Sequence, residues 1–172
     1  LVQNIVGVAK ADAYFNTNGH LHIKVEQKKA ICRVLTPDGK GYYIDDKGLI
    51  MPWVSVYTPN VFVCTGYISK YGKGLDSLKT NKDLNEGIFK LHQLLENNEF
   101  ISQLISHFYI DKNGNFWVYP VIGNQKFNWG KLDELEIKIK KTETFYSKII
   151  PIKGWDLYKE IDLRFNQQIV CK

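Results

Sequence analysis

The sequence lacks a long hydrophobic run and is poor in cysteine and methionine. No segment reaches the roughly 18 consecutive apolar residues that a membrane-spanning helix needs, so no span is predicted. The three cysteines show no Cys-x-x-Cys pair and no zinc-like spacing, which excludes a disulfide framework. Met51 is the only methionine and the chain begins at Leu1, so we expect it to be part of a longer protein.

A strong excess of either charge is also absent. The formal net charge is +5, and the basic residues are spread along the chain. Nucleic-acid-binding surfaces usually show as a basic cluster, so we predict no nucleic-acid partner. A diffuse positive excess of this size fits attraction to an anionic surface.

Residue types that support catalysis or metal binding occur without the partners they need. His20 and His22 share one face of a strand, but no third metal ligand is suggested by spacing. Asp45 and Asp46 are adjacent and point to opposite faces, so they cannot act as an acid/base pair. Cys64 lies in an apolar run and is interpreted as a buried residue rather than a nucleophile. We therefore predict no catalytic residue, no metal site and no cofactor.

Aromatic residues and turn signals, in contrast, are plentiful. Short runs rich in Val, Ile, Tyr and Phe are separated by four turn dipeptides: Asn18-Gly19, Asp38-Gly39, Lys47-Gly48 and Asn113-Gly114. This pattern predicts hairpins over residues 12–26, 30–45 and 104–121, and a further strand over residues 61–65. In the first hairpin apolar residues alternate with polar ones, so we expect one face to be buried through Leu21, Ile23 and Val25.

Two segments have helical rather than strand spacing. Apolar residues recur at helical intervals over residues 84–95 and again over residues 131–150. We expect Pro151 to end the second helix, because the residue before a proline is disfavoured in helical conformation. Residues 72–81 are polar and rich in Gly and Lys, so they are assigned to a loop. The solvated face of the second helix is assigned to Lys131, Glu134, Lys138 and Lys141.

The whole pattern predicts an α+β fold, a mainly antiparallel β-domain with two or three helices. Its last dozen residues alternate between apolar and polar side chains and read as one long strand over residues 160–172. A turn at Asn166-Gln167 is the less favoured alternative, since neither Gly nor Pro is present. At a sheet edge such a strand offers free N–H and C=O groups to an incoming strand. In the centre of a sheet it offers none, and both positions stay open.

Four blocks of the sequence, in this order, resemble the bacterial cell-division family FtsQ, also called DivIB. They cover nearly the whole chain: VEQKKAICRV, GYYIDDKGLIMPWVSVYTPNVFVCTGYI, FYIDKNGNFWVYPVIGNQKFNWGKLDELEIKIKKTETFY and GWDLYKEIDLRFNQQIVCK. The chain departs from the family pattern at Lys28-Lys29-Ala30, where relatives usually carry an Arg and a Pro. Without that proline we expect a less rigid junction between the two domains that the resemblance implies.

The resemblance implies a partial POTRA domain over residues 1–28, with a helix tail at residues 1–8, and a β-domain over residues 29–172. It implies a non-enzymatic divisome scaffold that links early and late cell-division proteins and binds FtsB and FtsL by β-strand addition. The full-length protein would cross the inner membrane once, through an N-terminal helix, and place this part in the periplasm at the septum. The partner contacts carried over are Arg164 and Phe165, followed along the strand by Gln168, Ile169 and Val170.

A different class of function is also consistent with the residues. The aromatic and lysine-rich surface fits a periplasmic β-domain that binds peptidoglycan or anionic lipid. A hydrolytic enzyme is the third hypothesis, and it would require an activity that depends on Cys64.

Overall fold

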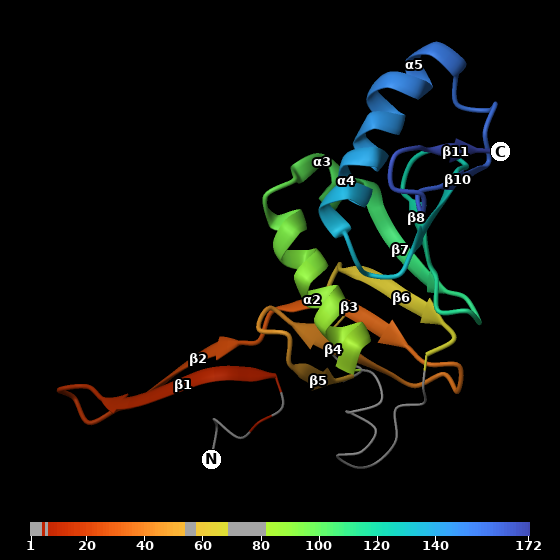
Figure 1. Ribbon diagram of the computed structural model, residues 1–172. Helices are drawn as coiled ribbons and strands as arrows, with labels where there is room; N and C mark the ends of the chain where they lie inside the picture. The colour runs from red at the N-terminus through yellow and green to blue at the C-terminus, as the bar shows by residue number, and fades with distance from the viewer. Residues whose placement is uncertain (1–4, 6, 54–57, 69–81) are drawn as a thin grey trace.

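The computed structural model describes residues 5, 7–53, 58–68 and 82–172 (Figure 1). The loop predicted over residues 72–81 lies outside this range, and so does most of the helix tail predicted over residues 1–8. The described residues of that tail, Ile5, Gly7 and Val8, are not helical, and Val8 begins a strand. The strands are β1 Val8–Phe15, β2 Leu21–Gln27, β3 Ala30–Leu35, β4 Gly41–Asp45, β5 Ile50–Pro52, β6 Phe62–Gly66, β7 Ile105–Ile110, β8 Phe116–Pro120, β9 Lys126–Gly130, β10 Glu160–Asp162 and β11 Val170–Cys171. The helices are α2 Lys82–Glu96, α3 Glu99–Leu104, α4 Leu135–Thr144, the π-helical η2 Phe145–Ile149 and α5 Ile150–Lys153.

The strands of the described chain form a separate β1–β2 hairpin and a nine-stranded sheet in the order β11-β10-β9-β8-β7-β6-β3-β4-β5. Most neighbours are antiparallel, and the parallel pairs are β3–β6, β6–β7 and β9–β10. Helices α2 and α3 connect β6 to β7, and α4 to α5 connect β9 to β10, as parallel pairing requires a crossover. The predicted α+β fold with a mainly antiparallel sheet is confirmed.

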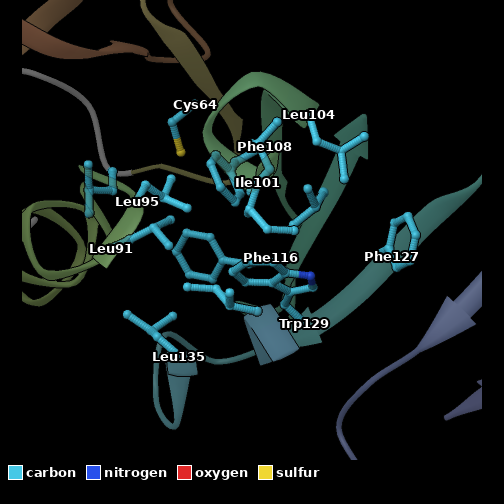
Figure 2. Packing of buried hydrophobic residues seen from close by; sticks show 14 of the residues in the cluster. Cys64, Leu91, Leu95, Ile101, Leu104, Phe108, Phe116, Phe127, Trp129 and Leu135 are labelled. Carbon is cyan, nitrogen blue, oxygen red and sulfur yellow. The ribbon is translucent and has the colours of Figure 1, made fainter. Parts of the chain in front are cut away.

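The core lies between one face of the large sheet and the helices (Figures 1 and 2). The helix predicted over residues 84–95 is confirmed, and its Leu91 and Leu95 point into this core. From the sheet, Phe108 and Trp129 meet edge to face with ring centroids 6.1 Å apart. Cys64 is fully buried as predicted, and burial raises the pKa of its thiol to about 12, so the thiol stays protonated.

The opening hairpin forms as predicted, but its apolar face is not buried. Leu21, Ile23 and Val25 pair with Phe15, Ala13 and Ala11 along one face of the ribbon, and all three are exposed. The hairpin extends away from the large sheet, and no described element covers it (Figure 1). Alternation correctly predicted which residues share a face, because that depends on the pleat alone. Burial depends on a second layer, which the pattern does not encode.

The second helix differs from prediction at its end. Pro151 does not end it, because the chain widens into the π-helical η2 and continues as α5 to Lys153. The backbone N–H of Ile150 bonds to the carbonyl of Phe145, five residues earlier. Pro151 then occupies the first turn of α5, where a missing N–H costs little. Termination falls instead at Gly154, which has φ +77°.

Lys138 was expected on the solvated face of this helix, and it is buried, with only 4% of its surface exposed. Its ammonium group donates to the carbonyl oxygens of Lys131 at 2.6 Å and Asp133 at 2.7 Å, and also to the Asp133 carboxylate. That hydrogen bond holds the pKa of Asp133 below its usual value. No side chain caps the start of α4 at Glu134. The hydrogen bonds from Lys138 therefore stabilise residues 131–133, which precede the helix.

Replacing Lys138 with methionine is expected to lower the free energy of unfolding by about 2 kcal/mol, because the carbonyls of Lys131 and Asp133 lose the buried ammonium group that donates to them. Urea denaturation measures the loss. Lys140→Met is the matched control, since Lys140 is exposed on the same helix and should change stability by at most about 0.5 kcal/mol. Equal effects of the two substitutions would contradict a capping role for Lys138.

Candidate functional site

The C-terminal segment does not form the single long strand that was predicted. Residues 160–172 fold into β10, a turn over residues 163–169, and β11, which returns antiparallel to β10. The backbone N–H of Gln168 donates to the carbonyl of Phe165 at 3.4 Å within the turn. The ammonium group of Lys141, on α4, donates to the carbonyls of Leu163 and Phe165 and holds the turn against the helix layer. Its turn residues are Asn166 and Gln167, so the alternative that the sequence favoured less is the one that forms, and the single long strand predicted from side-chain alternation is wrong.

The two terminal strands occupy different positions in the sheet. β10 is paired on both sides, parallel to β9 and antiparallel to β11, so it has no free edge. β11 is the last strand in the described order and has a neighbour on one side only. Figure 1 shows β11 at the end of the sheet, beside the C-terminus. The outer side of β11 is therefore an open edge within the described part of the chain.

The hydrogen-bond pattern determines which backbone groups face this open edge. Glu160 donates to the carbonyl of Lys172 at 3.1 Å and accepts from its N–H at 2.9 Å, so these two residues form a hydrogen-bonded pair. The next pair, Ile161 and Cys171, is then of the non-hydrogen-bonded type. The N–H and C=O of Cys171 consequently point away from β10. Val170, opposite Asp162, directs its own groups toward β10.

Arg164, the first predicted contact, lies in the turn and is engaged within the chain. Its guanidinium donates from Nε and Nη2 to the two carboxylate oxygens of Asp162, at 2.9 and 2.6 Å. This pairing lowers the pKa of the buried Asp162 carboxyl and raises the pKa of Arg164. The stem of Arg164 passes over Gly130, where an added Cβ would lie 2.9 Å from its Cγ. Arginine has five N–H donors, and two are used here, so others remain for a partner.

The other predicted contacts are divided between the turn and β11. Phe165 and Gln168 lie in the turn and are exposed, with 45% of Phe165 accessible. Ile169 is half-buried and packs against the core, and Val170 is half-buried in β11. The predicted residues therefore come together at one end of the sheet, although only Val170 belongs to a strand.

Several residues at this end were missed by sequence reasoning. Glu160 binds Lys126 at 3.2 Å and Lys172 at 3.8 Å on the sheet face opposite the helices. The Lys126 ammonium also lies 4.8 Å from the centre of the Trp117 ring. Opposite charges at Glu160 and Lys172 were visible in the sequence, but their pairing required the turn to be known. Lys141 was assigned to the solvated face of its helix, and no sequence signal pointed to its acceptors, which are backbone carbonyls far along the chain.

The thiol of Cys171 is expected to react with iodoacetamide more slowly than free cysteine at mildly alkaline pH. Burial raises the pKa of this thiol, and the thiolate is the reactive form, so the rate should rise only at higher pH. Mass spectrometry can follow alkylation at each cysteine, with the urea-unfolded chain as the control. A folded-state rate equal to that of free cysteine would contradict the half-buried position.

Within the described ranges, no helix is long and apolar enough to cross a membrane. No three His, Cys, Asp or Glu side chains gather in this part of the chain to hold a metal ion. The open edge of β11 therefore offers backbone hydrogen bonds at Cys171, and the arginine Arg164 and the exposed ring of Phe165 lie in the adjacent turn.

Comparison with known proteins identifies the chain at the level of a family. None of the curated proteins compared with it matches. The family model described as FtsQ/DivIB, C-terminal related, matches residues 29–172, which include the large sheet and its helices. FtsQ/DivIB proteins are non-enzymatic proteins of bacterial cell division and are anchored in the membrane at the septum. The chain belongs to the FtsQ/DivIB, C-terminal related family, with a role in cell division.

Proposed function

We propose that this chain is a non-enzymatic scaffold of the divisome that captures membrane-anchored partners of the FtsB and FtsL type by strand addition to β11. The observation that carries the proposal is the open outer edge of β11, where the N–H and C=O of Cys171 face away from β10. An extended peptide that pairs with such an edge gains main-chain hydrogen bonds and a defined register.

Side chains must supplement the backbone, because β11 has only two residues and provides few main-chain bonds. Phe165 presents an exposed ring in the adjacent turn, and aromatic rings are frequent anchors in interfaces. Arg164 retains free N–H groups for a partner carboxylate while Asp162 holds its orientation. Gln168, Ile169 and Val170 complete the contact surface between these anchors and the strand.

The proposal also includes the placement of the chain in the cell. Residues 1–28 would be the end of a POTRA domain, and residues 29–172 the β-domain in the periplasm at the septum. An N-terminal helix of the full-length protein would anchor it in the inner membrane. The family match over residues 29–172 supports this division of the chain.

Calorimetric titration with the extracytoplasmic segments of the cognate FtsB and FtsL tests the function. The parent chain is expected to bind, and Phe165→Glu to weaken binding about tenfold or more, because an apolar contact is lost and a charge is added. Tyr67→Glu is the matched control, since Tyr67 is an exposed aromatic residue that follows β6. Circular dichroism confirms that both variants fold. Binding undiminished in Phe165→Glu would count against docking at this site.

Sedimentation with purified peptidoglycan and with anionic vesicles tests the different class of function. A scaffold that recognises a polypeptide is expected to stay in the supernatant in both cases. Retention by either material, without binding of the protein segments, would favour a wall- or lipid-binding domain instead.

A further inference from the structure

Two loops pack against each other beside the open outer edge of β11, which we call the docking edge. The first comprises residues 121–124, after β8, and the second residues 154–159, between α5 and β10. The side-chain amide of Gln125 donates to the backbone carbonyl of Trp155. An added Cβ at Gly123 would lie 3.2 Å from the Trp155 ring, and Gly123 has φ +84°. A glycine at this position therefore allows the indole to lie directly on the first loop.

Several large apolar side chains are exposed on these loops and on the adjoining end of α5. We call this surface the apolar corner and define it by five large exposed side chains, with exposed fractions in parentheses: Ile152 (77%), Val121 (62%), Leu157 (57%), Ile122 (49%) and Trp155 (44%). Single exposed apolar residues are ordinary, whereas a group from two adjoining loops and from the end of α5, which carries Ile152, marks an interaction surface. Trp155 is fixed from beneath by Tyr146, whose ring centre lies 5.9 Å away. The Trp155 ring is thus held in place by Tyr146, while the apolar side chains of the corner are exposed to solvent.

The apolar corner is continuous with the docking edge. The backbone N–H of Lys159, at the end of the second loop, donates to the carbonyl of Lys172 at 2.7 Å. Its own carbonyl accepts from the N–H of Lys126 at 2.9 Å. The loop that carries Trp155 and Leu157 therefore ends beside the end of β11. A polypeptide paired with β11 and extended beyond Lys172 runs toward this corner.

The shape and charge of the corner indicate what occupies it. An open hollow of about 390 Å³ can receive side chains of a bound segment, and it is lined by Ile122, Gly123, Asn124, Trp155 and Asp156. Lys153 is exposed next to Ile152 in the chain, and the acidic Asp156 is offset by Lys159 at 3.6 Å. The remaining positive charge favours a segment that carries carboxylates.

We propose that the apolar corner binds the stretch of the partner chain next to its added strand, a stretch with apolar side chains flanked by carboxylates. This assignment rests on the proposed function, because the strand on β11 delivers the adjoining stretch to the corner. The interface then extends beyond the backbone pairing with the two residues of β11. Strand addition gives the register, and the corner gives apolar contact area.

The test compares two lengths of the cognate FtsB segment, one limited to the added strand and one extended at its flank toward the corner. The extended segment is expected to bind the parent chain more tightly. Leu157→Glu should weaken the extended segment about tenfold or more and leave the short one unchanged, because burial of one leucine has this magnitude. Leu49→Glu is the matched control, since Leu49 is equally exposed and precedes β5 at the opposite end of the sheet.

The outcomes separate the two proposals. Equal affinity of the two segments, or equal weakening of both by Leu157→Glu, would overturn the assignment of the corner and leave strand capture standing. Absence of binding by either segment to the parent chain would overturn the proposed function and, with it, this occupant. Sedimentation with phosphatidylglycerol vesicles that depends on Leu157 would assign the corner to a membrane surface instead.

Discussion

Replacing Cys171 with proline is expected to weaken capture of the partner strand about a hundredfold while the sheet stays folded. The N–H of Cys171 points to the open side of β11, so proline removes a donor that only the partner uses. Its ring also obstructs close approach of the incoming backbone. Together these losses are worth about 3 kcal/mol, which corresponds to about a hundredfold in affinity.

Two matched variants serve as controls. One tests whether the Cys171 side chain matters as well as its N–H, and the other removes an N–H that faces β10 instead of the open side. Cys171→Ser keeps the N–H and should bind nearly as well as the parent chain. Val170→Pro removes a group that faces β10, so it should loosen β11 itself and lower stability. Calorimetry measures affinity and urea denaturation measures stability. Normal binding by Cys171→Pro would exclude strand addition on this edge.

Replacing Phe127 with alanine is expected to lower the free energy of unfolding by about 3–5 kcal/mol, the usual cost of removing a buried aromatic ring. Phe127 is fully buried in β9 and meets the rings of Phe145 and Tyr146, with centroids 5.3 and 5.7 Å away. It thus attaches the π-helical η2 to the strand that supports β10. Such a loss is a large part of the stability of an ordinary domain, so thermal unfolding should occur at a much lower temperature.

Phe165→Ala is the control for Phe127→Ala, because it removes the same ring from an exposed turn. Its effect on urea denaturation should stay below about 1 kcal/mol. The two variants also distinguish a structural aromatic residue from a binding one. Phe127→Ala should lower stability, whereas Phe165→Ala should weaken partner binding. A small stability loss in Phe127→Ala would mean that η2 is attached through other contacts.

Local pattern predicted the elements well where a turn dipeptide or a helical stripe marked them. The hairpins at Asn18-Gly19 and Asn113-Gly114 and helix α2 formed as expected. The failures share one physical cause, which is dependence on partners distant in sequence or absent from the pattern. Lys138 is buried because backbone carbonyls of the preceding turn accept from it. The β1–β2 hairpin is exposed because alternation does not supply a covering layer.

The candidate site was found as a segment but not as a set of contacts. Arg164 and Asp162 lie two residues apart on one face of an extended chain, so their pairing was within reach of the sequence. The turn between β10 and β11 was considered only as the less favoured alternative, because neither Gly nor Pro marks it and its contact with Lys141 comes from a distant helix. The outward N–H of Cys171 follows from backbone pairing, which side-chain patterns do not report. The apolar corner required two loops to be brought together.

Because β10 pairs in parallel with β9, we expect the docking edge to form late in folding. Lys126 and Glu160 become neighbours only after the chain has passed through α4, η2 and α5 and returned to the sheet. Closing so long a connection is entropically costly and slow compared with forming a hairpin. β11, with two residues and one neighbour, should also be the first strand to open in the native state. On the proposed function, a partner strand therefore meets this edge only on chains whose helix layer is already assembled.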